Sequence, residues 1–473
     1  MMKVLLINPA FDFKKFGRFS RFMQPMPCLG LASIAAILEK NGIEVEIIDA
    51  FALRLEKSKV LKLIKGKSPD IVGISCMTPS APIVFSLAKD IKEYNENIKI
   101  VLGNVHATIF AEEIISNEAV DVIVHGEGEY TMLELVQALS QNKNLRQVKG
   151  ISFKDQREII STGQRALIDD LDSLPYPAWH LLPFKKYGFL PFMDVKKPGL
   201  SISGSKGCPY NCVFCSLPNI KGEYRKRNYK NIADEFEYLI ERFAIKQIGF
   251  VDPIFPFERE DALKFCREII RRGLNKRVVW ICETRIDRVD KELLKEMRRA
   301  GCRRILFGLE SGVEELLNNV KKRYSLDTIR KNISYAKKEG IQTAGLFMIG
   351  LPGETLEMTR KTINFAKEID LDFAKFAITV PFPGSVLYRD LIKIGKFKRR
   401  DWENFITFNP NPENLVCISE NITPEELIDM QCRAHKEFYL RPKVILNHLF
   451  KVRTISLSNL FHGFVNLILK WKI

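Results

Sequence analysis

Residues 200–216 read LSISGSKGCPYNCVFCS and decide how the rest of the chain is interpreted. The apolar start predicts a short strand over residues 200–203, and Cys208, Cys212 and Cys215 follow in the spacing CxxxCxxC. Cubic 4Fe–4S clusters are normally held by four cysteines. Three thiolates leave one iron with an open coordination position, which catalytic metal sites have and structural sites lack. The spacing therefore predicts a 4Fe–4S cluster whose open iron binds a small molecule and passes it an electron.

Two other interpretations of these cysteines are weaker. Structural zinc usually takes four ligands in two spaced pairs, and no second CxxC or HxxxH lies nearby. A disulfide would imply an oxidising compartment, whereas residues 1–7 run straight into a strand-like segment without a signal peptide. The other seven cysteines are scattered, mostly in apolar runs, and are predicted to be buried free thiols: Cys28, Cys76, Cys266, Cys282, Cys302, Cys417 and Cys432.

Length and composition predict a globular protein of two or three domains. The chain has 473 residues and is 46% hydrophobic. Its net charge is +16, from 73 Lys+Arg against 57 Asp+Glu. Because this excess is spread along most of the chain without a recognised nucleic-acid-binding signature, we expect a solvated basic surface and no nucleic-acid partner.

Residues 1–140 alternate strand-like and helix-like segments. A helix is predicted over Leu29–Lys40, ended by Asn41 and Gly42. Strands are predicted at residues 4–7, 45–48, 71–75, 98–102 and 122–124. This alternation favours a doubly wound, Rossmann-like parallel sheet with helices on both faces. Ligands of such sheets bind at the carboxyl ends of the strands.

The loops at those strand ends are predicted to form one ligand-binding edge. They are residues 8–10, 75–79, 103–108 and 125–129, and several are rich in glycine, which lets backbone approach a ligand closely. No GxGxxG follows the first strand, so a nicotinamide or flavin dinucleotide is disfavoured.

The remaining chain is predicted to hold a connector, a second α/β domain and a helical extension. Residues 141–195 form the connector, with a strand pair at 150–153 and 158–161 and paired prolines after it. Residues 196–405 resume the alternation, with strands at 200–203, 247–251, 278–281, 304–307, 343–349 and 376–380. Helices are predicted at 231–243, 259–271, 291–300, 313–320, 326–339 and 356–369. Six such units predict a partial (β/α)6 TIM-like barrel with its active site at the carboxyl ends of the strands.

Residues 406–473 are predicted to be a helical C-terminal region that ends in a basic stretch. Residues 438–473 hold six Lys or Arg and no acidic residue. The apolar run 455–469 is shorter than the roughly 20 residues of a membrane span. It either lies on a membrane as a basic amphipathic helix or covers the barrel with its apolar face. We favour the cover.

Taken together, these motifs resemble the radical S-adenosylmethionine (SAM) superfamily. The resemblance rests on residues 200–216, on residues 282–287 (CETRID), on residues 308–312 (GLESG) and on residues 350–355 (GLPGET). Residues 27–31 and 103–108 are similar to the cobalamin-binding domain of the cobalamin-dependent class. Within that class the chain looks most like the group of anaerobic magnesium-protoporphyrin IX monomethyl ester cyclases and hopanoid methylases.

The resemblance implies that the three loop cysteines hold the cluster and that SAM chelates its open iron. Reductive cleavage of SAM would release a 5′-deoxyadenosyl radical that abstracts hydrogen from an unactivated carbon. The implied SAM-binding residues are Tyr210, Phe214, Asp252, Arg285, Glu310 and Gly350. Other readings stay open: a structural ion pair of Arg285 with Glu310, a plain turn at Gly350, and a turn role for Asp252.

For cobalamin, the resemblance implies contacts along the strand-end loops. The implied residues are Asn8, Ser75, Thr78, Gly103, His106, Gly126, Glu127 and Gly128. The DxHxxG motif that supplies a cobalt-ligating histidine is replaced by residues 12–17, where Lys14 stands in the histidine position. Protonated lysine is a poor ligand, so the lower cobalt face would lack that histidine. His106 and His125 lie at this edge, but strand-end histidines more often hydrogen-bond within loops.

The function predicted is a cobalamin-dependent radical SAM enzyme that methylates or oxidatively cyclises an unactivated carbon of a large hydrophobic substrate, a lipid or tetrapyrrole. An alternative is a radical SAM enzyme with a cobalamin-free N-terminal domain that only holds substrate. A third is a metal-stabilised nucleic-acid-binding module. The first implies an electron donor such as ferredoxin or flavodoxin and a cytoplasmic location, peripheral to the inner face of the membrane if the C-terminal stretch lies on lipid.

Overall fold

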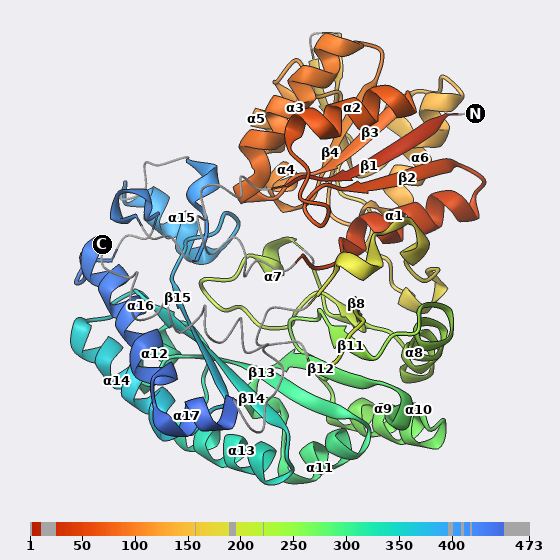
Figure 1. Ribbon diagram of the computed structural model, residues 1–473. Helices are drawn as coiled ribbons and strands as arrows, with labels where there is room; N and C mark the ends of the chain where they lie inside the picture. Colours follow the sequence, from red (N-terminus) through yellow and green to blue (C-terminus); the bar gives the residue numbers. More distant parts are fainter. Residues whose placement is uncertain are drawn as a thin grey trace. The chain divides into compact units, whose positions relative to one another are not determined.

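The computed structural model describes residues 2–10, 25–156, 158–188, 195–220, 222–395, 401–407, 411–416 and 419–448 (Figure 1). The described chain divides into two units. The N-terminal unit takes the described parts of Met1–Tyr187, Ser216–Arg225 and Arg400–Phe405. The barrel unit takes the described parts of Gly188–Cys215, Lys226–Arg399 and Ile406–Ile473. The chain therefore passes between the units several times.

One mixed sheet organises the N-terminal unit, in the order β2-β1-β3-β4-β5-β6-β7. The first five strands are parallel and β6 and β7 are antiparallel additions at one edge. The bounds are β1 Lys3–Asn8, β2 Glu44–Asp49, β3 Ile71–Ser75, β4 Lys99–Gly103, β5 Val122–Val124, β6 Ile151–Asp155 and β7 Glu158–Ser161. The strand pair predicted in the connector is therefore β6 and β7, which extend this sheet.

Helices cover both faces of this sheet. They are α1 Leu29–Lys40, α2 Lys57–Lys67, α3 Ala81–Tyr94, α4 Val105–Ile109, α5 Ala111–Ile115 and α6 Gly128–Ser140. Helix α1 packs against α6, and α2 packs against α3. Since β2 and β3 lie on opposite sides of β1, right-handed crossovers put α1 and α2 on opposite faces. All five residues of β3 are buried, as expected of a central strand covered on both faces.

The barrel unit is built on six parallel strands in the order β15-β14-β13-β12-β11-β8. Their bounds are β8 Gly199–Ile202, β11 Gln247–Phe250, β12 Val279–Thr284, β13 Cys302–Glu310, β14 Gln342–Ile349 and β15 Phe373–Ile378. Sequence order equals spatial order, so each strand is followed by a crossover to its neighbour. This confirms the predicted doubly wound domain followed by a partial (β/α)6 barrel.

In Figure 1 most of the barrel helices lie along the outer side of the sheet, whereas α15 lies beyond the end of β15. They are α8 Tyr229–Phe243, α9 Arg259–Arg271, α10 Leu274–Arg277, α11 Lys291–Arg299, α12 Glu314–Asn319, α13 Leu326–Lys338, α14 Leu356–Glu368 and α15 Val386–Lys393. Shorter elements are α7 Leu217–Ile220, β9 Ser205–Lys206 and β10 Arg225–Lys226.

Side chains of Asp290, Ser325 and Thr355 cap α11, α13 and α14, accepting from the third backbone N–H of each helix. These caps set the helix starts within one residue of the positions predicted from the sequence.

Helix α16 (Pro424–Tyr439) closes the free edge of β15 with polar side chains. Gln431 Nε2 donates to Phe376 O at 2.8 Å, and Tyr439 Oη donates to Ala374 O at 2.8 Å. His435 accepts from Phe376 N at 3.4 Å. These residues are spaced at i, i+4 and i+8, so one helix face satisfies an edge that would otherwise be open.

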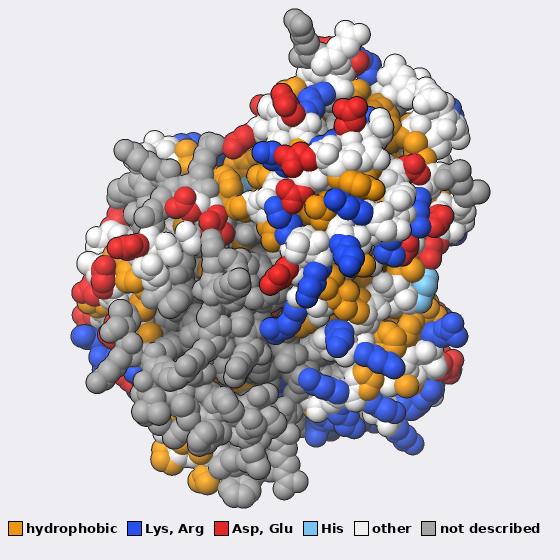
Figure 2. Space-filling model, turned by 45° about the horizontal axis from the view of Figure 1, so that its top comes forward, with side chains coloured by type: hydrophobic (Ala, Val, Ile, Leu, Met, Phe, Trp, Pro, Cys, Tyr) orange, Lys and Arg blue, Asp and Glu red, His pale blue; other side chains and the backbone are white. Residues whose placement is uncertain are grey.

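The described C-terminal region packs on the barrel unit. Helix α17 (Pro442–Asn447) follows, and His448 bonds Asp372 O at 2.7 Å. The predicted helical extension is thus confirmed through residue 448, whereas the apolar run 455–469 lies outside the described residues. Across the described residues, none of the helices combines the length and the apolar character that crossing a bilayer requires. On the face shown in Figure 2, described Lys and Arg side chains are distributed over several elements among acidic and apolar ones.

Candidate active site

The cysteine loop follows β8 at the carboxyl end of the barrel sheet. Cys212 is buried, whereas Cys208 and Cys215 are half-buried. Cys215 N donates to Cys212 O at 3.0 Å, which closes a tight turn between the last two cysteines. Burial raises the pKa of the Cys212 thiol, and the nearby Lys322 ammonium opposes that rise. Within the described part of the chain, no three His, Cys, Asp or Glu side chains converge on a single-ion site.

Apolar contacts hold the middle of this loop in place. Val213 and Phe214 pack against a buried cluster that contains Leu316, Val320 and Leu351. Val213 O also accepts from Leu387 N at 2.9 Å, where α15 begins. The loop is therefore anchored between its cysteines by α12, by the turn after β14 and by α15.

Arg285 lies directly after β12 and keeps a free donor. Its Nε donates to Asp287 Oδ1 at 2.9 Å and its Nη2 donates to Lys322 O at 2.6 Å. The guanidinium carbon lies 3.9 Å from the centre of the Tyr210 ring. Among the described residues, Arg285 Nη1 and Tyr210 Oη are buried without a hydrogen-bond partner. Buried donors normally have partners, so two orphans side by side mark a place for a ligand.

Glu310 ends β13 in a strained conformation. Its φ is +60°, in the left-handed region that non-glycine residues rarely adopt. The pairing of β13 with β14 shifts register between Gly308 and Glu310. Its carboxylate forms an ion pair with Lys322, with 2.8 Å between Oε1 and Nζ. The ion pair of Glu310 with Arg285 considered from the sequence is therefore wrong, since Arg285 pairs with Asp287 instead.

Gly308 makes room for the ion pair of Glu310 with Lys322. A Cβ at this position would lie 2.8 Å from Glu310 Oε1 and 3.1 Å from Lys322 Nζ. Both atoms belong to buried side chains, so neither could move away cheaply. Lys322 was not among the residues predicted from the sequence, because one lysine in the run 321–323 (KKR) carries no pattern that distinguishes it.

The predicted turn at Gly350 is organised by a buried carboxylate. Gly350 has φ +79°, and Glu354 Oε2 accepts from Gly350 N at 2.7 Å and from Leu351 N at 2.9 Å. Thr359 donates to the other carboxylate oxygen at 2.9 Å. Burial raises the pKa of Glu354 to about 7. The segment is thus a tight turn at the end of β14, and the hydrogen bonds of Glu354 fix its conformation.

Asp252 lies after β11 and bonds the segment that leads into the cysteines. Its Oδ2 accepts from Gly204 N at 2.9 Å, and Ser205 Oγ donates to Oδ1. Asp252 is 2% exposed, and burial raises its pKa to about 6. Its side chain is therefore occupied in positioning residues 204–205.

The concave side of the sheet carries two more ionisable groups, Glu283 on β12 and Lys375 on β15. Burial and the neighbouring Glu310 raise the pKa of Glu283 to about 7, while Lys322 and Lys375 oppose the rise. Burial lowers the pKa of Lys375, which Glu283 opposes. Strands β12 and β15 are separated by β13 and β14, so this mutual influence requires a curved sheet with both side chains on its inner face.

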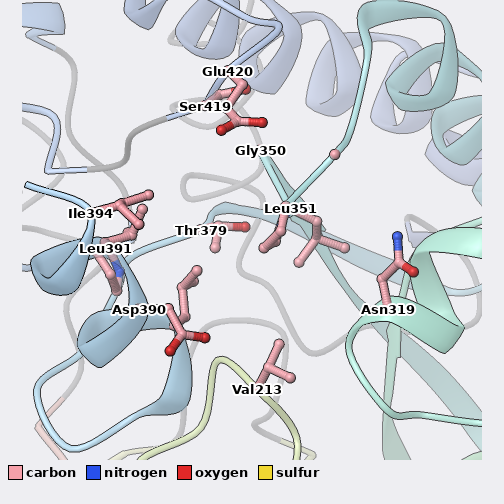
Figure 3. A pocket seen from close by; sticks show the side chains of 14 residues that line it. Val213, Asn319, Gly350, Leu351, Thr379, Asp390, Leu391, Ile394, Ser419 and Glu420 are labelled. Atoms are coloured by element: carbon pink, nitrogen blue, oxygen red, sulfur yellow. The ribbon is translucent and has the colours of Figure 1, made fainter. Parts of the chain in front are cut away.

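A cavity of about 310 Å³ lies beside the cysteine loop (Figure 3). Leu351 and Thr379 lie near the middle of the view, with Asn319 on one side and Ile394, directly after α15, on the other. Val213 of the cysteine loop also lines it. The cavity therefore joins the ends of β14 and β15 to the loop, and its size is within the range of small-molecule sites.

In the N-terminal unit, several predicted strand-end residues form hydrogen bonds with other residues of the same unit. Asn8 donates to Asp49 Oδ1 at 2.9 Å, and Ser75 Oγ accepts from Asn104 Nδ2 at 2.9 Å. Thr78 is buried in a short 3₁₀ turn. Gly126 has φ +61° and open space where a Cβ would stand. Gly103 and Gly128 lie at the end of β4 and the start of α6.

Glu127 is engaged in a buried ion pair inside the N-terminal unit. Arg225 Nη2 and Nη1 donate to its two carboxylate oxygens at 2.8 and 3.0 Å. Ile168 N donates to Oε2 at 2.8 Å. Arg225 therefore fastens the segment Ser216–Arg225 to the strand-end loop of this unit.

The two histidines of this edge differ. His106 is 1% exposed and packs among aromatic rings, with ring centres 4.8 Å from Phe110 and 4.9 Å from Trp402. Burial lowers its pKa to about 4. His125 Nε2 bonds Ser152 Oγ at 2.8 Å, as expected of a loop histidine. Lys14 and residues 12–17 lie outside the described residues.

Two family models match the chain in the order of its units. The model described as B12 binding domain matches residues 20–136, and the model described as Radical SAM superfamily matches residues 202–366. An uncharacterized methyltransferase from Pyrococcus horikoshii is 32% identical over 98% of this chain and 96% of its own length. The chain belongs to the cobalamin-binding radical SAM enzymes.

Further members of this family are similar over most of the chain. The anaerobic magnesium-protoporphyrin IX monomethyl ester cyclase of Cereibacter sphaeroides is 30% identical over 93% of this chain and 71% of its own length. A radical SAM methyltransferase from Kitasatospora setae, a solved structure, superposes with a TM-score of 0.68 at 21% identity, over 84% of this chain and 76% of that one. That likeness confirms the fold.

Family membership brings a 4Fe–4S cluster, SAM and cobalamin as cofactors. The barrel unit fits the first two, because three thiols stand beside two orphaned buried donors and a cavity. At the N-terminal edge, Gly126 follows a strand end and has open space around it, and strand ends are where ligands of doubly wound sheets bind.

Proposed function

We propose that this chain is a cobalamin-dependent radical SAM methyltransferase that acts on an unactivated carbon of a large, mostly apolar small molecule. The observation that carries the proposal is the cysteine loop beside the orphaned Arg285 and Tyr210 donors. It supports SAM binding at a cluster with one open iron. Methyl transfer is preferred to cyclisation because the methyltransferase relative matches almost end to end, whereas the cyclase is matched over 71% of its length.

Each cofactor would be held by residues already in place. Cys208, Cys212 and Cys215 would hold the cluster. Arg285 Nη1 would donate to the SAM carboxylate, a charge-assisted bond that orients it. When bound, the cluster supplies the electron that cleaves SAM, and cobalamin supplies the methyl group.

The cavity next to the loop would hold the adenosyl part of SAM. Its apolar side chains, such as Leu351 and Ile394, exclude water from the base, while Thr379 Oγ1 is a buried polar atom without a partner among the described residues. A dry pocket protects reactive intermediates from side reactions. Glu283 and Lys375 on the inner face would contact a polar group of an otherwise apolar substrate.

The experiment that tests this function is an anaerobic assay with labelled SAM. The cluster-reconstituted protein is incubated with hydroxocobalamin, methyl-deuterated SAM, a low-potential reductant, and lipid or tetrapyrrole extracts. Methyl transfer is expected to give a product that carries deuterium from the methyl group. A product that has lost hydrogen and carries no label would show cyclisation instead. Absence of corrin absorbance after reconstitution would favour the cobalamin-free alternative.

A further inference from the structure

Lys322 is a buried lysine of the barrel unit that forms an ion pair with Glu310. It is 7% exposed, between Lys321 and Arg323, which are both exposed. Those two neighbours have φ of +63° and +56°. Left-handed backbone costs non-glycine residues roughly 1 kcal/mol or more each. In the loop after α12, the backbone is therefore strained on both sides of Lys322, whose side chain is buried.

The buried ammonium lies at a junction of the site. Its Nζ is 2.8 Å from Glu310 Oε1 and 3.3 Å from Gly308 O. Its backbone carbonyl accepts from Arg285 Nη2 at 2.6 Å. Its Nζ is also 5.9 Å from the centre of the ring of Phe214, the residue before the third cysteine. One residue thus contacts Glu310 and Arg285 directly and stands next to the cysteine loop.

The ammonium remains charged despite its burial. Desolvation by burial lowers the pKa of Lys322, but Glu310, Tyr324 and Cys212 together raise it above its ordinary value. If Lys322 only filled space, an apolar side chain of similar volume would give equal or greater stability. A fixed positive charge therefore belongs to the site at any physiological pH.

We propose that Lys322 is a positioning residue. Its ion pair holds the carboxylate of Glu310, whose backbone is in the left-handed region, and its positive charge favours reduction of the cluster. Net charge near an iron–sulfur cluster sets its reduction potential. Removal of Lys322 also leaves the Glu310 carboxylate without its counter-charge, which further opposes adding an electron. This inference rests on the cluster assigned under the proposed function.

The test is a redox titration of the reconstituted full chain, followed by EPR of the reduced cluster. Titanium(III) citrate delivers the single electron, and the ratio of reduced to oxidised cluster is read at the wild-type midpoint potential. In Lys322→Met that ratio is expected to fall at least tenfold, which corresponds to about 59 mV for one electron. Lys322→Arg keeps the charge and is expected to stay within threefold of wild type.

Two further variants separate charge from structure. Lys321→Met removes a neighbouring exposed charge from the same strained loop and is expected to stay within twofold of wild type. Glu310→Gln is expected to raise the ratio, because it removes a negative charge, so the inference remains testable if Lys322→Met does not fold. An unshifted Lys322→Met, an arginine variant shifted as far as the methionine one, or no rise in Glu310→Gln would each overturn it.

Failure of this inference is distinguishable from failure of the proposed function. If the wild-type protein binds no cluster iron and shows no cluster EPR signal, the proposed function is wrong. If wild type carries the cluster but the potentials of the variants do not move, only the role of Lys322 is wrong.

Discussion

The strand ends of the two units differ in how far their polar side chains are satisfied. In the N-terminal unit, Asn8, His125 and Glu127 bond partners inside the unit, while the buried His106 Nδ1 has none among the described residues. In the barrel unit, Arg285 Nη1 and Tyr210 Oη have no partner among the described residues, and Glu310 sits in a left-handed conformation.

This difference indicates two ways of preparing a cofactor site. The barrel keeps charged donors ready at one place, which suits a small zwitterion that must be oriented. At the N-terminal edge most of the predicted polar side chains, His106 apart, already bond residues of the same unit. A large ligand would therefore be held there mainly by backbone, glycine and shape.

The largest effect is expected from the cysteine loop. Changing Cys208, Cys212 or Cys215 to Ala should abolish SAM cleavage and sharply lower bound iron, because the cluster has no spare protein ligand in the motif. Iron analysis and deoxyadenosine formation measure the two effects. Cys266→Ala, which removes a buried thiol of α9, is the matched control and should retain both. Full cleavage by any of the three loop variants would refute the assignment.

Loss of the orphaned donor at Arg285 should come next. Arg285→Met is expected to weaken SAM binding about 10- to 100-fold, since a charge-assisted hydrogen bond contributes roughly 1.5–3 kcal/mol. Equilibrium binding of SAM to the reconstituted protein measures this. Arg288, exposed and 5.5 Å from the same Tyr210 ring, offers a control in Arg288→Met. Equal losses in both variants would mean that stacking, not the free donor, matters.

Breaking the pair of Glu127 with Arg225 should destabilise the N-terminal unit. Both side chains are about one-tenth exposed, so Glu127→Gln is expected to lower the free energy of unfolding by about 2–4 kcal/mol. Denaturant titration measures it, and Arg225→Met should show a similar loss with strong non-additivity in the double variant. If Glu127 instead binds the corrin as the sequence predicted, cobalamin affinity would fall and stability would hardly change.

The smallest effect is the acid sensitivity of His106. Its folded pKa of about 4 lies below the ordinary 6.5, so the unfolded chain binds the extra proton first. The stability that neutral His106 contributes is therefore present above pH 6.5 and is lost as pH falls toward 4, by roughly 2 kcal/mol at pH 5. Unfolding at pH 7.5 and pH 5 should show less loss for His106→Phe. An unchanged loss would mean that His106 titrates normally.

Much of the fold follows from local patterns in the sequence. The predicted bounds of α1 and α9 match the structure, because an apolar stripe and a stop signal mark them in the chain itself. The strand pair near residue 150 was also predicted, but its place at the edge of the N-terminal sheet depends on β5, some 30 residues earlier.

Candidate site residues could be predicted from the sequence where they lie in motifs of fixed spacing. The cysteines, Arg285, Glu310 and Gly350 were predicted in this way, and the structure places them at strand ends of one sheet. Lys322 and Glu354 bond the backbone or carboxylates of those residues, yet no spacing marks either one. The partner of Arg285 was also missed, because Asp287 and Glu310 are equally plausible from the sequence.

Cysteine spacing and hydrophobic alternation predicted the cluster and the fold class, because both are properties of neighbours along the chain. SAM and cobalamin were implied by the resemblance to a known family. Which polar groups remain free is visible only in the folded chain. That outcome depends on contacts between residues far apart in sequence, such as Glu127 with Arg225, and on backbone strain at Glu310, which no local pattern records.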